Sequence, residues 1–157
     1  MTTVSFDLDT DVGAERILTA LTDFSTRRID LFPDLDRGFY RVHGQGDRWA
    51  EVTEGRSVAG GVWERSRYDW SEPDTVRTQL LDSNAFGPGS YWLYRVTPNA
   101  RGGAHVHFEL RRVPTSLKGR LLAALFSVAG KRVFRTDLEA TLKRLRTAPE
   151  LQHGSSL

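Results

Sequence analysis

Cysteine is absent from this chain of 157 residues. Disulfide bonds and thiolate catalysis are therefore excluded, and the absence is typical of a protein from a reducing compartment. Long apolar runs are also missing, because the longest, from Leu121 to Gly130, has about half the residues that a membrane-spanning helix needs. The N-terminus lacks the basic and then apolar stretch of a signal peptide. We therefore expect a cytoplasmic protein.

Motifs that mark common catalytic sites are scarce too. The sequence has no phosphate-binding loop of the Gly-x-x-x-x-Gly-Lys type and no serine in a nucleophile elbow. His105 and His107 alternate with Glu109 along one predicted strand, a spacing that a metal site could use. We interpret that strand face as solvated, and we expect no metal ion and no cofactor.

The net charge is small, +2 at neutral pH, with 27% charged and 39% hydrophobic residues. Nucleic-acid binding is not indicated, because it needs a basic groove interleaved with aromatic residues. Here the basic residues cluster in one segment. Acidic residues predominate from Asp7 to Asp36, and basic residues from Lys118 to Arg146. We interpret these segments as two solvated faces of one fold. The alternative is a basic helix face that meets an anionic membrane or an acidic ligand.

The predicted elements are one strand, two short helices, a series of strands and one long helix. Alternation of Val4, Phe6 and Leu8 with polar residues predicts the first strand. Caps and apolar spacing predict helices over 12–21 and 25–32. Turn residues divide a region rich in β-branched and aromatic residues into six further strands: 39–43, 48–53, 58–70, 75–82, 90–97 and 104–113. Short connections favour antiparallel pairing, so we predict an α+β fold with a sheet of about seven strands.

The long C-terminal helix is predicted over Thr115–Arg146, which contains no proline and would be roughly 45 Å long. We expect residues 1–146 to form a single domain. The polar residues 147–157 are expected to be a disordered tail.

Two apolar stripes lie on different faces of this helix. One contains large residues in its C-terminal half and small ones in its N-terminal half: Phe134, Leu138 and Leu142, then Ser127, Ala124 and Ala123. The other is formed by Leu117, Leu121, Leu125 and Val128. Either the helix breaks at Gly130, because glycine costs about 1 kcal/mol relative to alanine, or it runs straight. We favour the straight helix, whose small residues would leave an unfilled volume beneath them that a ligand could occupy.

Nearly the whole chain resembles one known superfamily. The segments that carry the resemblance are SFDLDTDVGAERILTALTDFSTRRIDLFPDL, GRSVAGGVWERSRYDW, NAFGPGSYW, RGGAHVHFEL and DLEATLKRL. The sequence is similar to the START-like or SRPBCC superfamily, and within it to polyketide cyclase/dehydrase-like proteins. The resemblance implies the helix-grip fold, in which a curved antiparallel sheet wraps around the long C-terminal helix. It also implies a deep cavity between sheet and helix that holds a hydrophobic or amphipathic small molecule, lipid-like or aromatic.

Strand alternation predicts which side chains face that cavity. The expected inward set is an aromatic wall with a few polar groups, the usual makeup of a small-molecule site. From the strands it contains Val62, Glu64, Ser66, Tyr68, Thr78, Leu80, Trp92, Tyr94, Val106 and Phe108. From the helix it contains Ala123, Ala124, Ser127 and Phe134. Phe86, at the tip of the loop 84–89, is a candidate gate at the entrance.

Glu64 is the one carboxylate predicted inside, and burial among aromatic rings is expected to raise its pKa. Such a group suits acid–base catalysis, and Tyr68 and Tyr94 could hold a ligand carbonyl by hydrogen bonds. The alternative is that Glu64 faces solvent and pairs with an arginine on a neighbouring strand.

Three functions remain open from the sequence. The first, which we favour, is binding of a hydrophobic small molecule without chemical change, because no dense set of titratable groups converges. The second is a polyketide cyclase or aromatase type of enzyme that uses Glu64 and the cavity tyrosines. The third is a homodimer or peripheral membrane contact through the row Leu117, Leu121, Leu125 and Val128.

Overall fold

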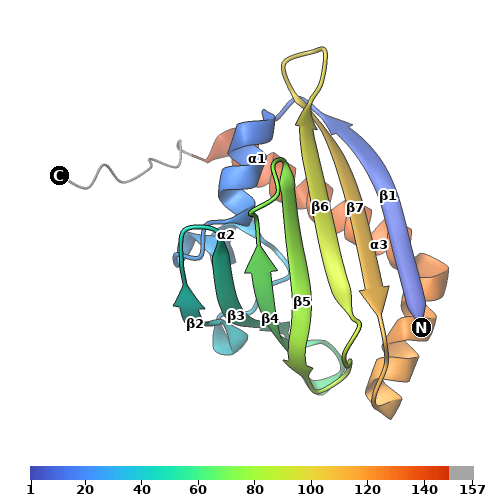
Figure 1. Cartoon of the computed structure of the whole chain (residues 1–157). Helices are drawn as coiled ribbons and strands as arrows, with labels where there is room; N and C mark the ends of the chain where they lie inside the picture. The colour runs from blue at the N-terminus through green and yellow to red at the C-terminus, as the bar shows by residue number, and fades with distance from the viewer. Residues whose placement is uncertain (149–157) are drawn as a thin grey trace.

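The structure, a computed structural model, describes residues 1–148 of the chain. Seven strands form one antiparallel sheet in the order β1-β7-β6-β5-β4-β3-β2 (Figure 1). The strands are β1 (Thr2–Thr10), β2 (Arg41–Gln45), β3 (Trp49–Arg56), β4 (Val62–Asp69), β5 (Thr75–Ser83), β6 (Tyr91–Pro98) and β7 (Ala104–Arg112). The helices are α1 (Ala14–Leu21), α2 (Arg27–Leu31) and α3 (Leu117–Thr147), with short 3-10 turns η1 (Arg37–Phe39) and η2 (Val58–Gly60). The predicted α+β fold is confirmed.

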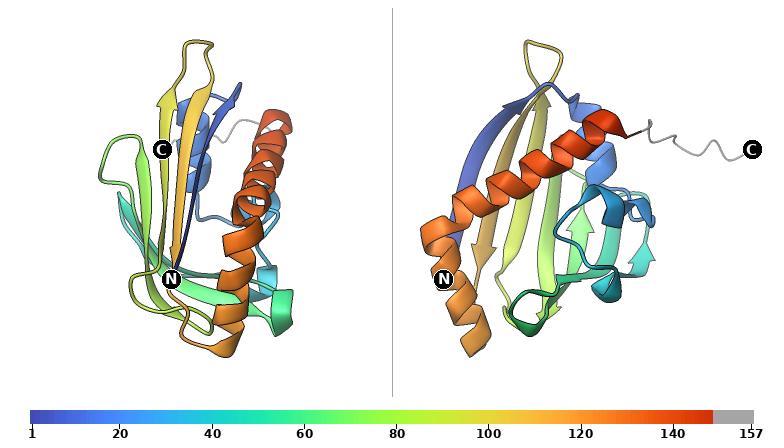
Figure 2. Two further views of the ribbon diagram at one scale, coloured as in Figure 1. Left: turned by 90° about the vertical axis from the view of Figure 1, so that its right-hand side faces the viewer. Right: turned by 180° about the vertical axis from the view of Figure 1, so that it is seen from behind.

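The sheet is curved, and α3 crosses its concave face as a second layer (Figure 2). Inward side chains of adjacent strands stand directly opposite one another, as Phe6 does to Phe108 and Tyr94 does to Phe108. The C-terminal half of α3 buries Leu138 and Leu142 in the main core, as predicted for that stripe. The candidate site lies in the space between the sheet and the rest of α3.

The hairpin β4–β5 has the predicted register, with Tyr68 opposite Thr78 and Ser66 opposite Leu80. A bulge between Arg65 and Ser66 then shifts the pairing between the two strands. Along β4 itself the alternation continues, so Glu64 stays on the inner face. The inward placement of this carboxylate therefore follows from the alternation of side chains between the two faces of a strand.

Helix α3 is one continuous helix of 31 residues that passes through Gly130 without a break. It is not straight, because it changes direction in its N-terminal half, beside the start of β1 (Figure 2). There the Thr2 hydroxyl donates to the Ala123 carbonyl over 3.2 Å, and the Ser127 hydroxyl donates to the same carbonyl over 2.9 Å. A serine that bonds to the carbonyl four residues earlier bends helices. Both the break at Gly130 and the straight helix are therefore wrong.

The small residues of α3 let the helix lie directly on β1. Ala123 is buried, and a Cβ atom added to Gly130 would lie 2.8 Å from Cγ2 of Val4. Ala124 and Ser127 are exposed. The unfilled volume predicted beneath Ala123, Ala124 and Ser127 is absent from the described structure, because the close approach of helix and strand fills it.

No helix within residues 1–148 is long and apolar enough to cross a membrane. The disordered tail predicted for 147–157 falls almost entirely outside the described residues. Its first residue, Thr147, is the last residue of α3.

Candidate functional site

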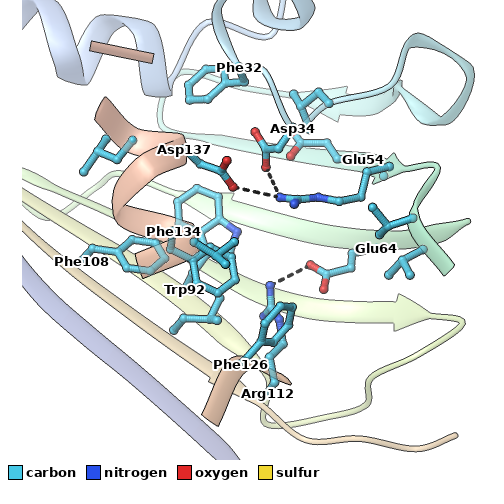
Figure 3. Close-up of a pocket in the computed structure, with 18 of the residues that line it drawn as sticks. Phe32, Asp34, Glu54, Glu64, Trp92, Phe108, Arg112, Phe126, Phe134 and Asp137 are labelled. Carbon is cyan, nitrogen blue, oxygen red and sulfur yellow. Dashed lines mark hydrogen bonds and ion pairs between the residues drawn. The ribbon is translucent and has the colours of Figure 1, made fainter. Parts of the chain in front are cut away.

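A cavity of about 330 Å³ lies between the concave face of the sheet and α3. Figure 3 shows Trp92 of β6, Phe108 of β7, and Phe126 and Phe134 of α3 around this space. Tyr94 joins them, with ring centroids 5.0 Å from both Trp92 and Phe108. The ring of Phe134 is next, with its centroid 5.8 Å from that of Phe108. Aromatic pairs at these distances stabilise each other, so the wall is a well-packed apolar surface.

Arg28 of α2 is buried beside the cavity, with 2% of its surface exposed. Its Nε atom donates to Glu54 over 2.7 Å, and its Nη2 atom donates to the Tyr68 hydroxyl over 3.2 Å. The Tyr68 hydroxyl donates in turn to the second oxygen of Glu54 over 2.7 Å. Burial alone would lower the pKa of Arg28, but the charges of Glu54 and Tyr68 and their hydrogen bonds together outweigh it, and the net shift is upward. The guanidinium group is therefore a fixed positive charge in this part of the wall.

Arg112, at the end of β7, brings a second guanidinium group into the cavity. Its Nη2 atom lies 3.2 Å from Oε2 of Glu64, and both side chains are largely buried. The guanidinium also lies over the ring of Phe86, 5.4 Å from its centroid. Glu64 is thus inside the cavity, as predicted, but it is paired with a cation and is not surrounded by aromatic rings alone. The alternative of a solvent-facing Glu64 paired with an arginine on a neighbouring strand is wrong, because its arginine partner lies on β7, two strands beyond the neighbour β5.

Arg56, at the end of β3, pairs with two carboxylates, those of Asp34 and Asp137, which Figure 3 shows close to each other. Its Nη2 atom lies 2.6 Å from Asp34, in the segment after α2, and 3.6 Å from Oδ2 of Asp137 on α3. Burial raises the pKa of Asp137, and the negative charge of Asp34 adds to the shift. Asp137 Oδ2 has no hydrogen-bond partner within residues 1–148. This oxygen is buried, and its charge is balanced by the ion pair with Arg56.

The cavity opens to the surface near the turn η2. Two residues that line it, Val58 of η2 and Leu125 of α3, are also exposed. A shallow groove outside shares Asp34, Arg56, Val58 and Asp137 with the cavity. The Arg56 ion pairs therefore lie at the opening, whereas Arg28 lies at the buried end.

The structure brings seven of the predicted site residues together around the cavity: Val62, Glu64, Phe86, Trp92, Tyr94, Phe108 and Phe134. Phe86 is buried at 3% exposure, because it packs beside Phe126. It is part of the wall, and its predicted place at the entrance is wrong. Burial raises the pKa of Tyr94, so its hydroxyl group remains a proton donor at neutral pH.

The other predicted site residues do not line the cavity. Ser66, Tyr68, Thr78, Leu80 and Val106 face inward as predicted but are buried beneath the cavity wall. The Tyr68 hydroxyl is already used by Arg28 and Glu54, and that of Thr78 by the backbone of Trp92. Ala123, Ala124 and Ser127 are also outside the lining, because this part of α3 contacts β1 or faces solvent.

Sequence reasoning missed the charged residues of the cavity: Arg28, Asp34, Glu54, Arg56, Arg112 and Asp137. Alternation could have found three of them. Arg112 follows Val106, Phe108 and Leu110 on the inner face of β7, and Glu54 and Arg56 continue the inner face of β3. Nothing in the sequence indicates that Arg28 and Asp137 face the cavity, because a charged residue on a helix is usually solvated.

The outer face of β1 and β7 carries the two histidines that raised the question of a metal site. His105 contacts Asp7 at 2.9 Å and Asp9 at 3.1 Å, and His107 contacts Asp7 at 3.1 Å. These hydrogen bonds raise the pKa of His105 and lower that of Asp7. Within the described residues, no group of three or more His, Cys, Asp or Glu side chains is arranged to hold a metal ion.

No protein-family model and no curated protein sequence matches the chain. Solved structures do match. The Zhui aromatase/cyclase from Streptomyces sp. R1128 is similar at a TM-score of 0.75 and 15% identity, over 99% of this chain and 98% of that one. A START superfamily protein from Mycobacterium smegmatis has a TM-score of 0.74 and 13% identity, over 94% and 99%. A STAR-related lipid transfer protein from Xanthomonas axonopodis has a TM-score of 0.70 and 13% identity, over 92% and 85%.

These matches extend over nearly the whole of this chain, although the identities are low. At such identities the similarity concerns the backbone arrangement and does not extend to activity. The chain therefore has the START-like helix-grip fold that the resemblance predicted.

Proposed function

We propose that the chain binds a hydrophobic or amphipathic small molecule in the cavity beneath α3. The observation that carries this proposal is a cavity of about 330 Å³ whose wall is mainly aromatic and aliphatic, and whose charged side chains are all held in ion pairs. Sites for small molecules are typically concave, mostly apolar and about 300–1,000 Å³ in volume. The cavity is at the lower end of this range, so it suits a compact ligand.

The placement of the polar groups supports an amphipathic ligand. The rings of Trp92, Tyr94 and Phe108 offer one apolar surface along the sheet. A polar group on the ligand can bind to the Tyr94 hydroxyl or to Asp137 at the opening. The ion pairs of Arg28 and Arg112 are already formed without a ligand, so binding need not bury an unpaired charge.

The similar structures indicate two ligand classes worth testing. One is described as an aromatase/cyclase and another as a lipid transfer protein. We favour reversible binding for this chain, because Tyr68 is not in contact with the cavity and Glu64 is held in an ion pair.

Native mass spectrometry of freshly purified protein tests the proposal. We expect a co-purified apolar molecule bound to the wild-type chain. Leu122→Trp places an indole ring in the cavity wall, where it takes up space, and should remove this molecule. The adjacent Leu121→Trp, on the exposed face, should retain it. Absence of a bound molecule from the wild type, or equal binding by both variants, would contradict the proposal.

A second candidate is a cyclase-type enzyme that folds a poly-β-ketone chain in the same cavity. The observation in its favour is Asp137, a carboxyl group of raised pKa that lines the cavity. A raised pKa brings a carboxyl group closer to the range in which general acids and bases work. Asp137→Asn and Glu64→Gln should each reduce turnover of a poly-β-ketone mimic by about 10²-fold or more if the carboxyl groups act as acid or base. Turnover that is absent from the wild type, or unchanged in both variants, would exclude this mechanism.

A further inference from the structure

The N-terminal half of α3 presents four large apolar side chains to solvent. Leu117, Leu121, Leu125 and Val128 are 74, 67, 53 and 90% exposed. Their spacing of four, four and three residues places them on one stripe of the helix. We call this stripe the exposed leucine face. A single exposed leucine is ordinary, but four on one helix face form a contiguous patch of the kind that marks an interaction surface.

Along α3 the charged residues next to the exposed leucine face are basic as far as Arg135, which pairs with Glu139 over 3.5 Å. From Leu117 to Thr136 the helix has no acidic residue and five basic ones: Lys118, Arg120, Lys131, Arg132 and Arg135. At 100° per residue, Arg132 and Arg135 continue the stripe itself, and Arg120 and Lys131 lie along one side of it. Arg120 and Arg132 have no carboxylate within ion-pair distance among residues 1–148, so their charges are available to a partner.

We propose that this surface docks on a lipid membrane with anionic headgroups. An apolar helix face flanked by Lys and Arg is the usual design of a helix that lies in the membrane interface. The apolar residues would enter the headgroup region, and the basic residues would contact lipid phosphates.

A second copy of this chain fits the same surface less well. In a symmetric dimer the basic residues of one α3 would face those of the other, and like charges at an interface repel. A protein partner is also less suited, because interface hot spots are enriched in Trp, Tyr and Arg, whereas the apolar part of this face contains only Leu and Val.

The exposed leucine face is continuous with the opening of the cavity. Leu125 belongs to the face and also lines the cavity, and Val58 of η2 is exposed on the other side of the opening. Lys118 Nζ donates to the Gly61 carbonyl over 2.9 Å, which ties the start of α3 to the segment after η2. A membrane docked on this face would therefore lie next to the opening. The docking itself does not depend on what the cavity holds.

Vesicle sedimentation tests the proposal with the full chain. The probes are vesicles of phosphatidylcholine alone and vesicles in which about a third of the lipid is phosphatidylglycerol. We expect binding to the anionic vesicles only, weakened by salt. Leu121→Gln with Val128→Gln should reduce this binding at least about tenfold, since both apolar anchors are lost. Arg132→Gln should reduce it about fivefold.

Matched controls separate docking from general effects. Leu81→Gln removes an exposed leucine from β5, and Arg101→Gln removes an exposed arginine from the β6–β7 turn. Neither should change vesicle binding. All four variants alter exposed side chains, so unchanged thermal unfolding will confirm that each is folded. Failure of the wild type to bind anionic vesicles, or equal losses in the controls, would overturn the proposal. So would a dimer that Leu121→Gln with Val128→Gln converts to monomer, because the face would then be a protein interface.

Discussion

Arg28 is the residue on which the buried end of the cavity depends. It pairs with Glu54 and contacts Tyr68, and its guanidinium group lies 4.5 Å from the centroid of the Phe24 ring. Removal of one partner of a buried ion pair is strongly destabilising, because the other charge is left unpaired. No periodic pattern in the sequence distinguishes Arg28 from the adjacent Arg27, which is exposed. Its role depends on tertiary contacts and could not be predicted.

Arg28→Met should lower the free energy of unfolding by about 3–5 kcal/mol, measured by urea denaturation. Arg27→Met is the matched control and should change it by less than about 0.5 kcal/mol. Arg28→Met combined with Glu54→Gln should recover part of the loss, since no lone charge then remains. A loss of less than about 1 kcal/mol in the single variant would show that the pair contributes little.

His105 should make stability depend on pH. Its pKa is raised in the fold above the ordinary value of 6.5 by hydrogen bonds to Asp7 and Asp9. The folded state therefore favours the protonated ring, and this stabilisation is fully present below about pH 6.5 and is lost as the pH rises through the raised pKa.

The difference in unfolding free energy between wild type and His105→Gln should thus be largest near pH 5.5 and shrink toward about pH 9. His43→Gln, which alters a histidine on the distant strand β2, is the control and should leave the slope of the wild type unchanged. A difference that grows with pH would show that the sign of the shift is wrong.

At the scale of elements, the start of α3 is fixed by a close approach to the loop after β5. A Cβ atom added to Gly119 would lie 1.9 Å from the Ala85 carbonyl oxygen, well inside contact distance. The sequence predicted this helix, and Ser116 caps it by accepting a hydrogen bond from the Gly119 amide. It could not predict the bend, because the bend depends on a hydrogen bond from Thr2, which is 121 residues away.

Gly119→Ala should therefore destabilise the fold by about 1–3 kcal/mol, although alanine favours a helix by about 1 kcal/mol over glycine. Gly130→Ala should cost less, because its added Cβ atom would meet a side-chain methyl group of Val4 at 2.8 Å. Denaturant unfolding of both variants measures which of them loses more free energy of unfolding. Stabilisation by Gly119→Ala would mean that the loop moves away without cost.

At the scale of the whole molecule, the antiparallel sheet and the place of α3 across it were predicted, but the composition of the cavity was predicted only in part. Alternation placed Trp92, Tyr94 and Phe108 correctly, because one face of every strand must be buried. It could not separate residues that line the cavity from those packed beneath it, as Val106 is. That distinction depends on the curvature of the sheet and the path of α3.

A ligand in the cavity should stabilise the whole molecule. A compound that binds only the folded state adds about 2.7 kcal/mol at a concentration of 100 times its Kd. Calorimetry should show a midpoint that rises with the concentration of a bound apolar compound for the wild type. The rise should be absent in Leu122→Trp and retained in Leu121→Trp. An equal rise in both variants would place the compound outside the cavity.

Strand β1 pairs along its whole length with β7, from Thr2 opposite Arg112 to Thr10 opposite Ala104. The strands β2 to β6 are instead joined by local hairpins. During synthesis the first strand must therefore wait until nearly the entire sheet has emerged before it finds its neighbour, and long-range pairing of this kind slows folding. The hairpin strands can assemble early, and β1 and α3, which bond to each other through Thr2 and Ala123, complete the molecule together.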